Sequence, residues 1–347
     1  MKGSKVYLLT GFIIFLTCKM AIYSQNRFRI AELNVENLFD CRHDEGKLDE
    51  MFLPTAIRRW TTSRYWRKQE ALSKELIALG GDIPADLIAL CEVENDSVMH
   101  DMTERSILRS VGYRYIITDS PDERGIDVAL LYQPQTFKLI NWQALRVNFG
   151  LLPPKHTRDV LHVTGRLQTG DTLDVYVCHL PSRLGGKKYT DPYRLCVSQM
   201  IRHSVDSIMR CRCHPLVVIT GDFNDTVNGV AFREGLKIEP FSEDILPSVF
   251  SLYNIGEGKI GNNGAKGTYY YDKEWETIDH LIVSGGLLLK SASLHTSPSF
   301  FCLADFPFLL QWDEWKNCFP FRTYKGMRYQ AGYSDHLPIY ADFFYSW

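Results

Sequence analysis

The stretch from residue 217 to 225, Val-Val-Ile-Thr-Gly-Asp-Phe-Asn-Asp, limits the possible folds of this chain more than any other feature. Four apolar or β-branched residues indicate a short buried strand, which the glycine ends. Asp222 and Asn224 follow at once and stand two residues apart, so both side chains can point into one open cleft. There they would hold a phosphoryl oxygen or orient an attacking water. Gly-Asp-Phe-Asn is also a good tight turn, so this stretch alone does not decide between the two interpretations.

The hydrophobic pattern elsewhere predicts a layered α/β fold. Helices are predicted at 60–79, 102–111 and 193–210, and strands at 28–37, 86–91, 113–118, 128–132, 161–167, 173–178, 217–220, 278–283 and 339–344. Many strands follow one another without an intervening helix, which favours a layered α/β sandwich over a purely parallel sheet. No repeat or Gly/Ser/Pro-rich linker divides the 347 residues, so residues 26–347 are expected to form one domain.

Residues 1–25 have the pattern of a secretory signal peptide. Lys2 and Lys5 precede an apolar run over 6–18, and small residues follow at a plausible cleavage point. The run is too short and interrupted for a membrane span of ~20 residues. A lipid anchor at Cys18 is disfavoured, because threonine precedes it where a smaller residue is usual. We therefore expect an exported chain, periplasmic or extracellular, with no transmembrane segment after cleavage.

Without its first 25 residues the chain is acidic, with 36 basic and 41 acidic side chains and a net charge of −5. A protein that holds nucleic acid by bulk electrostatics is not expected to carry this charge, so metal ions would have to supply positive charge locally. A basic and aromatic cluster over 58–68 offers contacts to a phosphate backbone, but an amphipathic helix with inward tryptophans is the favoured interpretation. The aromatic segment 300–324 is expected to be a lid or structural excursion rather than a membrane loop.

Eight cysteines follow residue 25. Cys91 and Cys178 lie in apolar strands and are expected to be small buried thiols. Cys302 and Cys318 flank the aromatic segment and are the best disulfide candidates in an exported chain. We expect the protein to be a monomer.

Carboxylate, amide and imidazole side chains recur where the apolar strands start or stop. They are Asn34, Glu92, His179, Asp222 with Asn224, Asp279 with His280, and Asp335 with His336. Each has an ordinary explanation as a cap, a solvated strand end or a core histidine, but six such events are not expected to be independent. Magnesium takes one or two carboxylates together with water and substrate phosphate. Phosphodiester hydrolysis also needs an aligned water and a proton for the leaving group, which these side chains can supply.

The ordered motifs resemble the endonuclease/exonuclease/phosphatase superfamily, over residues 28–344. The motifs are Leu33-Asn34, Ala89-Leu90-Cys91-Glu92, Cys178-His179, Gly221-Asp222-Phe223-Asn224, Ile278-Asp279-His280 and Ser334-Asp335-His336. The resemblance implies a four-layer α/β sandwich of the DNase-I type, in which two mixed β-sheets pack face to face between outer helices. The site would lie at one edge of the sandwich.

The resemblance also implies a metal site and a catalytic site. Glu92 would be the principal ligand of Mg²⁺, or of Mn²⁺ or Ca²⁺, with Asn34 and Asp335 nearby. His336 would pair with Asp279 and either activate water or stabilise the phosphoryl group.

Asp222 and Asn224 would orient the water and the phosphate, and Asn224 would also bind substrate. His179 would act as acid to the leaving oxygen, and Asp127 either orients this histidine or lies in a surface turn. Arg183 either meets a substrate phosphate or forms a plain salt bridge.

Two positions depart from the family pattern. Cys91 precedes Glu92 where the family usually has glutamine, so support for the metal ligand is expected to differ. His280 follows Asp279 where many relatives carry another residue, and we expect it to be structural.

The sequence does not fix the phosphoester. Ser334-Asp335-His336-Leu337-Pro338 resembles inositol 5-phosphatases, but Asp225 and the stretch 275–280 depart from their motifs. The preferred interpretation is an exported, magnesium-dependent phosphodiesterase, a nuclease acting on DNA or RNA. The alternatives are a phosphatase, a phospholipid phosphodiesterase or a non-catalytic binding protein.

Overall fold

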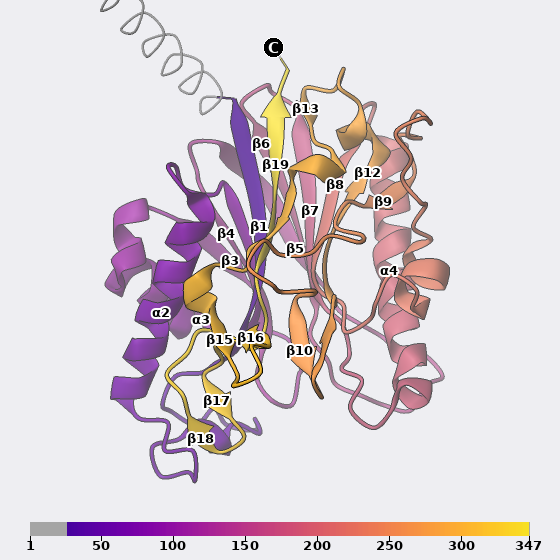
Figure 1. The fold of residues 1–347 in the computed structure, drawn as a ribbon. Coiled ribbons are helices and arrows are strands. Elements are labelled where there is room, and N and C mark those ends of the chain that lie inside the picture. Colours follow the sequence, from indigo (N-terminus) through magenta and orange to yellow (C-terminus); the bar gives the residue numbers. More distant parts are fainter. Residues whose placement is uncertain (1–25, 347) are drawn as a thin grey trace, which may run out of the picture.

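Two mixed β-sheets form the centre of the molecule (Figure 1). The computed structural model describes residues 26–346, so the expected signal peptide, 1–25, and Cys18 lie outside the described residues. The first sheet contains β1 (Arg27–Leu38), β2 (Leu87–Val93), β3 (Arg114–Ile117), β4 (Asp127–Tyr132), β13 (Leu294–His295), β14 (Phe301–Leu303) and β19 (Ile339–Tyr345). The second contains β5 (Phe137–Leu145), β6 (Val160–Leu167), β7 (Thr172–His179), β8 (Leu216–Asp222), β9 (Leu252–Asn254) and β12 (Asp279–Ser284).

The strand order places the motif-bearing strands side by side. The first sheet has the order β13–β19–β1–β2–β4–β3, with β14 also pairing with β19, and the second has the order β5–β6–β7–β8–β12–β9. Within these sheets, β1 runs parallel to β2 and β7 parallel to β8, and the other pairs are antiparallel. The ends of β1, β2, β7 and β8 therefore meet the beginnings of β12 and β19 at one end of the sandwich.

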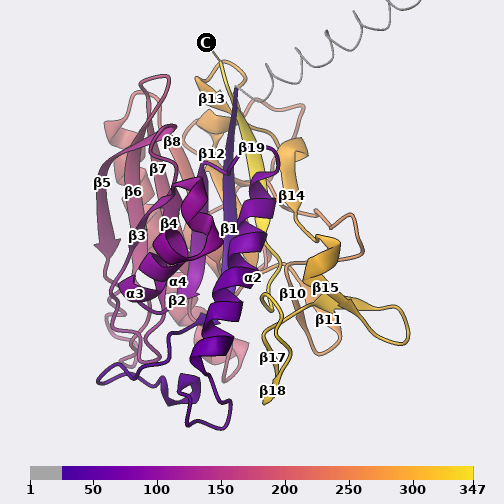
Figure 2. The same ribbon diagram turned by 90° about the vertical axis from the view of Figure 1, so that its left-hand side faces the viewer.

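Helices cover the outer face of each sheet, and small hairpins project from one side. The helices are α2 (Thr62–Gly80), α3 (Asp96–His100) and α4 (Lys187–Cys211). The hairpins are β10 (Tyr269–Tyr271) with β11 (Glu274–Glu276), β15 (Leu310–Trp312) with β16 (Cys318–Pro320), and β17 (Tyr324–Lys325) with β18 (Arg328–Tyr329). In the turned view they lie on the same side of the two sheets as β14 (Figure 2).

Three buried apolar clusters separate four layers. Because side chains alternate between the two faces of a strand, Ile30 of β1 packs between the sheets while Leu33 packs against α2. Likewise Val218 of β8 lies in the cluster between the sheets, and Val217 packs against α4. The four-layer α/β sandwich expected from the resemblance is the observed fold (Figure 1).

The two long helices form where the apolar spacing predicts them. In α2, Leu72, Leu76 and Leu79 recur at helical spacing and face the first sheet, and Gly81 ends the helix with φ +71°. Helix α4 begins at Lys187, six residues before the predicted start, and continues through Pro192.

The predicted helix over 102–111 is wrong. The chain forms a π-helical turn at Asp101–Arg105 and a 3₁₀ turn at Ile107–Val111. Ser106 between them is extended, because its hydroxyl accepts from Leu108 N at 3.0 Å and caps the second turn. Strand β5 was not predicted, since it is an edge strand with a mostly exposed face and little apolar alternation.

Part of the basic and aromatic segment 58–68 is buried, in keeping with the predicted inward tryptophans, whereas Arg59 and Arg67 stay exposed. Trp60 is buried and donates to Phe39 O at 2.9 Å. Lys68 is buried too, where it donates to Thr323 Oγ1 at 2.6 Å and lies 3.9 Å from Glu36. The Lys68 contact fastens α2 to the C-terminal segment, and neither of these two buried side chains is available to nucleic acid.

The aromatic segment 300–324 is a structural excursion. It supplies β14 to the first sheet and the β15–β16 hairpin, and Asp305 accepts from the backbone of Asn262, Asn263 and Ala265. The expected disulfide is absent: all eight cysteines from Cys41 onward are thiols, because Cys302 lies in β14 against β19 while Cys318 packs in a separate cluster. No helix between residues 26 and 346 is both long and apolar enough to cross a membrane.

Candidate active site

The polar strand ends converge because of the two-residue period of the strands. Residues that face the opposite sheet continue into polar residues at one end of the sandwich: Val177 is followed at the same face by His179, and Val218 by Asp222. The antiparallel partner β12 begins with Asp279, which lies directly opposite Asp222 in register. The core between the sheets therefore ends in a group of buried carboxylates and imidazoles.

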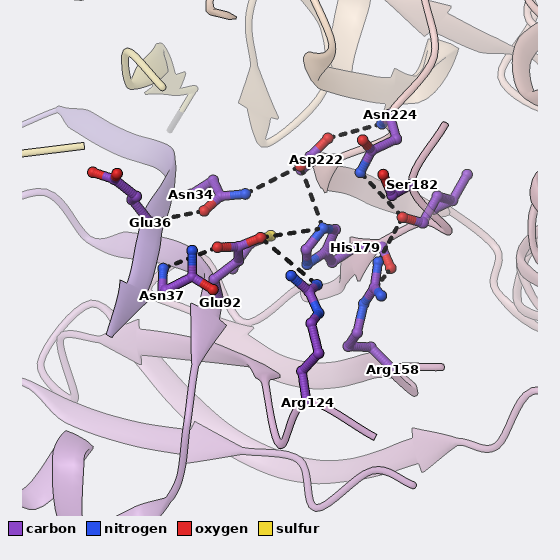
Figure 3. A network of polar contacts seen from close by, with 12 residues as sticks. Asn34, Glu36, Asn37, Glu92, Arg124, Arg158, His179, Ser182, Asp222 and Asn224 are labelled. Atoms are coloured by element: carbon purple, nitrogen blue, oxygen red, sulfur yellow. Dashed lines mark hydrogen bonds and ion pairs between the residues drawn. The ribbon is translucent and has the colours of Figure 1, made fainter. Parts of the chain in front are cut away.

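Asp222 is the centre of this group. Its Oδ2 accepts from Asn34 Nδ2 at 3.1 Å, and its Oδ1 accepts from Asn224 N at 2.8 Å (Figure 3). His179 Nε2 lies 3.4 Å and His336 Nε2 4.0 Å from Oδ2. Burial, and then the charge of Asp279, raise the pKa of Asp222 to about 7.

His336 is held by Asp279. Its Nδ1 lies 2.8 Å from Asp279 Oδ2, and its backbone N–H donates to Ser334 Oγ at 3.1 Å. Ser334 Oγ in turn donates to Asn34 O at 2.5 Å, which ties the last motif to β1. Burial by itself would lower the pKa of His336, but Asp279 outweighs it and the pKa lies well above its usual value.

His179 has the opposite environment. Burial, then the nearby guanidinium groups of Arg158 and Arg124, hold its pKa well below the usual value. Among the described residues its Nδ1 has no hydrogen-bond partner. The idea that Asp127 orients it is wrong, because this buried carboxylate accepts from Thr118 Oγ1 at 2.5 Å and Ser120 N at 3.0 Å instead.

Glu92 reaches the same place through an irregular backbone. The pairing of β2 with β4 shifts register between Cys91 and Val93, and Glu92 has φ +66°, a left-handed conformation that costs roughly 1–2 kcal/mol outside glycine. Its Oε2 accepts from Asn37 N at 2.9 Å, while Oε1 lies 3.9 Å from both Arg124 and His179 (Figure 3). The kink turns the carboxylate toward the two histidines.

Cys91 does not take over the role of the glutamine usual in the family. Its thiol is buried between the sheets and donates to Cys178 O at 3.4 Å, so it supports the packing of the two sheets rather than the carboxylate of Glu92. His280 is structural, as expected. It is buried, with Nδ1 3.0 Å from Asn254 Nδ2 and Nε2 3.0 Å from Asp225 O.

Most of the predicted site residues border a cavity of about 760 Å³. Seven of the nine predicted site residues line it: Glu92, His179, Arg183, Asp222, Asn224, Asp335 and His336. Asn34 and Asp279 are fully buried behind the wall and hold Asp222 and His336 from there. Polar residues that border the cavity are therefore held in place by further polar residues buried behind them.

Arg183 is paired within the wall. Its guanidinium donates to Glu276 Oε1 at 3.0 Å and also contacts the second carboxylate oxygen. Of the two interpretations left open by the sequence, the salt bridge is the one that the structure contains.

Other wall residues were missed. Arg124 precedes β4 by three residues and borders the cavity, and it was not predicted as a site residue. Arg322 is not among the cavity-lining residues, but it donates to Asp335 Oδ2 at 2.6 Å, and nothing local in the sequence pointed to it. Tyr269 and Tyr271 lie in a Tyr-Tyr-Tyr run without the alternation that marks a buried strand.

Two sets of residues are candidates for holding a metal ion. Asp222, Asp279 and His336 offer ligand atoms within 4.8 Å of one another, but the last two already share a hydrogen bond. Glu92 and Asp335 both border the cavity, and among the described residues no hydrogen bond reaches Glu92 Oε1 or Asp335 Oδ1. Hard divalent cations prefer such carboxylate oxygens. The amide of Asn34, predicted as a third ligand, is instead bonded to Asp222 and to Glu36 N.

The comparisons with known proteins agree with this arrangement. The sequence profile of the Endonuclease/Exonuclease/phosphatase family matches residues 29–344. No curated protein matches the chain. Similar solved structures include the human nocturnin catalytic domain, with TM-score 0.55, 16% identity, and 92% of this chain and 95% of that chain covered.

Two further solved structures share the fold. Mannosyl-6-phosphatase of Bacteroides thetaiotaomicron has TM-score 0.58 and 16% identity, with 92% of this chain and 100% of that chain covered. A humanized TDP2 of D. rerio has TM-score 0.54 and 16% identity, with 91% and 98% covered. The chain therefore belongs to the endonuclease/exonuclease/phosphatase family and is a phosphoric ester hydrolase.

Proposed function

We propose that this chain is an exported, magnesium-dependent enzyme that cleaves a phosphoric ester with a water aligned by Asp222 and Asn224. One observation carries the proposal: Glu92, His179, Asp222 and His336, which come from four separate strand ends, border a single cavity. A structural role for each residue would not require their side chains to meet.

Asp222 is the general base in this proposal. Its Oδ2 lies within 4.0 Å of both histidines, so a water beside it would contact the carboxylate and an imidazole together. Asp222 would take a proton from the water as the water oxygen bonds to phosphorus. The ester P–O bond breaks, and the leaving alkoxide takes a proton from solvent water. Asn224 is fixed by its bond to Leu180 O at 3.2 Å and would orient the phosphoryl group.

The two histidines have different partners and therefore different roles. His336, bonded to a buried carboxylate through Nδ1, is placed as an imidazolium whose Nε2 would stabilise phosphoryl charge. His179 Nε2 lies 3.4 Å from Asp222 Oδ2, but burial and then the guanidinium groups of Arg158 and Arg124 hold its pKa well below the usual value. We therefore assign it as a neutral hydrogen-bond donor to a phosphoryl oxygen, and not as the acid that the resemblance implied.

Glu92 and Asp335 would hold the magnesium ion. The ion would offset the negative charge of the phosphoryl oxygens, a need that fits the net charge of −5 expected for the exported chain. Asn37 and Arg322 keep the two carboxylates in place, through bonds of 2.9 and 2.6 Å. This proposal does not require the net charge of the whole protein to select the substrate.

DNA or RNA, the substrate predicted from the sequence, is one candidate for this site. A phosphatase acting on a smaller ester is the second, and a specific observation favours it: several carboxylates, including Glu274 and Glu276, border the cavity. A polynucleotide would bring further phosphates close to them.

Metal dependence and chemistry can be tested together. Purified residues 26–347 would be assayed on bis-p-nitrophenyl phosphate and p-nitrophenyl phosphate, with and without EDTA and with Mg²⁺, Mn²⁺ or Ca²⁺ restored. We expect hydrolysis that EDTA abolishes and Mg²⁺ restores, and that Asp222→Asn lowers by ~10² or more. Metal binding without hydrolysis of any ester would instead support a non-catalytic binding protein. Fractionation of cells expressing the full chain tests export.

A further inference from the structure

The cavity continues outward from the catalytic residues along a row of aromatic rings. The Tyr269 ring lies 4.8 Å from the His336 imidazole, centre to centre. The Tyr271 ring follows it, nearly parallel, with a centre-to-centre distance of 6.3 Å and an interplanar angle of 7°. Both rings border the cavity, and Tyr271 is 66% exposed. Aromatic rings therefore line the cavity from His336 outward to the exposed Tyr271.

This wall is held in a fixed position relative to the catalytic residues. Tyr269 pairs with His336 as a backbone bridge, and Leu337 N donates to Thr268 O at 2.7 Å. Thr268 Oγ1 accepts from Asp279 N at 3.2 Å. The segment that carries the tyrosines is thus bonded to both members of the His336–Asp279 pair, so a group on the rings would have a defined distance from the phosphate.

The charges around the rings are unsuited to a second phosphate. Asp272, Glu274 and Glu276 border the outer cavity. The three cations that border the cavity already lie near carboxylates: Arg183 is paired with Glu276, Lys187 with Asp225 at 3.2 Å, and Arg124 lies 3.9 Å from Glu92. Two acidic side chains remain without a cation in the cavity wall. An added phosphate within a Debye length of about 10 Å would be repelled.

From this arrangement we infer that the scissile phosphate is carried by an uncharged, hydroxylated ring, that is, a sugar unit, which packs on Tyr269 and Tyr271. This inference rests on the proposed function and names its substrate class. Carboxylates only accept hydrogen bonds, so Glu274 and Asp272 match the hydroxyl donors of a sugar. The C–H face of such a ring can cover the apolar tyrosine surface, and a pocket with apolar walls and a few placed polar groups is typical of small-ligand sites.

The test compares two alkyl phosphates with a primary alcohol as leaving group. One, a hexose 6-phosphate, has a ring, and the other, glycerol 3-phosphate, has none. Phosphate release with Mg²⁺ gives kcat/KM for each. We expect the wild-type ratio of hexose 6-phosphate to glycerol 3-phosphate to exceed about ten, as expected for a stacking contact. Tyr271→Ala should lower that ratio about tenfold. Trp142→Ala, which removes an exposed aromatic ring from the edge strand β5, is the matched control and should leave the ratio unchanged.

A short oligodeoxynucleotide is the third substrate, and it is assayed with the wild type and with the Glu274→Gln variant. Three results would overturn the inference: a ratio near one in the wild type, an unchanged ratio in Tyr271→Ala, or a higher kcat/KM on the oligodeoxynucleotide than on the hexose phosphate. Each of them presupposes turnover of some ester. Absence of turnover on every ester, including p-nitrophenyl phosphate, would instead refute the proposed function and with it the substrate assignment.

Discussion

Replacement of His336 by alanine should affect activity and stability through separate physical causes. The imidazole is the only described partner of Asp279 Oδ2, and Asp279 Oδ1 has no partner among the described residues. Asp279 is fully buried. His336→Ala would therefore leave an uncompensated buried carboxylate, and the loss of one partner of such a pair costs about 3–5 kcal/mol of the free energy of unfolding. Turnover should fall by ~10² or more, because the imidazole that we propose to contact the phosphate is gone.

The double variant Asp279→Asn/His336→Ala separates the two effects. It contains no buried charge to compensate, so it should lose only about 1–2 kcal/mol relative to the wild type and be more stable than the single variant. Its turnover should stay as low as that of His336→Ala. Urea denaturation gives the free energies of unfolding, and p-nitrophenyl phosphate hydrolysis gives turnover. Turnover of His336→Ala within fivefold of the wild type, or a double variant no more stable than the single one, would refute the reasoning.

Three other predictions concern the metal, the backbone and acid stability. Glu92→Gln should raise the Mg²⁺ concentration for half-maximal activity by ~10-fold or more, measured by metal titration, and an unchanged concentration would exclude Glu92 as a ligand. Gly221→Ala should lower the free energy of unfolding by more than about 4 kcal/mol, because the new Cβ would lie 1.8 Å from Cys178 O and the backbone has φ +141°. A variant that unfolds in urea at the same concentration as the wild type would contradict this. Burial would raise the pKa of Asp174, but bonds from His162 Nε2 and Thr164 Oγ1 outweigh it and lower the pKa below 3.8. A carboxylate with a lowered folded-state pKa contributes stability above pH ~4 that is lost at lower pH. Asp174→Asn should therefore be less stable than the wild type at pH 7, with a difference that narrows below pH 4 in urea denaturation, and a constant difference would speak against this charge effect.

The local sequence determined the elements whose side chains repeat with a clear period. Val217 to Thr220 indicated a buried strand, and the spacing of Leu72, Leu76 and Leu79 indicated a helix, because burial of one face demands these patterns. The edge strand β5 escaped prediction, since an exposed strand is under no such demand. The break at Ser106 was also missed. A serine hydroxyl can accept a hydrogen bond from a nearby backbone N–H and so interrupt a helix, but the residue type alone does not show whether it does.

For the site, the sequence determined which side chains have the right chemistry, and the order of motifs identified the family. That Asp222, Glu92 and His336 share one cavity follows from strand order, which brings parallel ends of β1, β2, β7 and β8 to one edge. Hydrogen-bond partners were decided by tertiary structure alone: Asp127 bonds to Thr118 rather than His179, and Arg322 reaches Asp335 from the segment between two hairpins. Hydrogen bonds depend on ångström-scale placement, and a linear pattern of residue types does not contain that information.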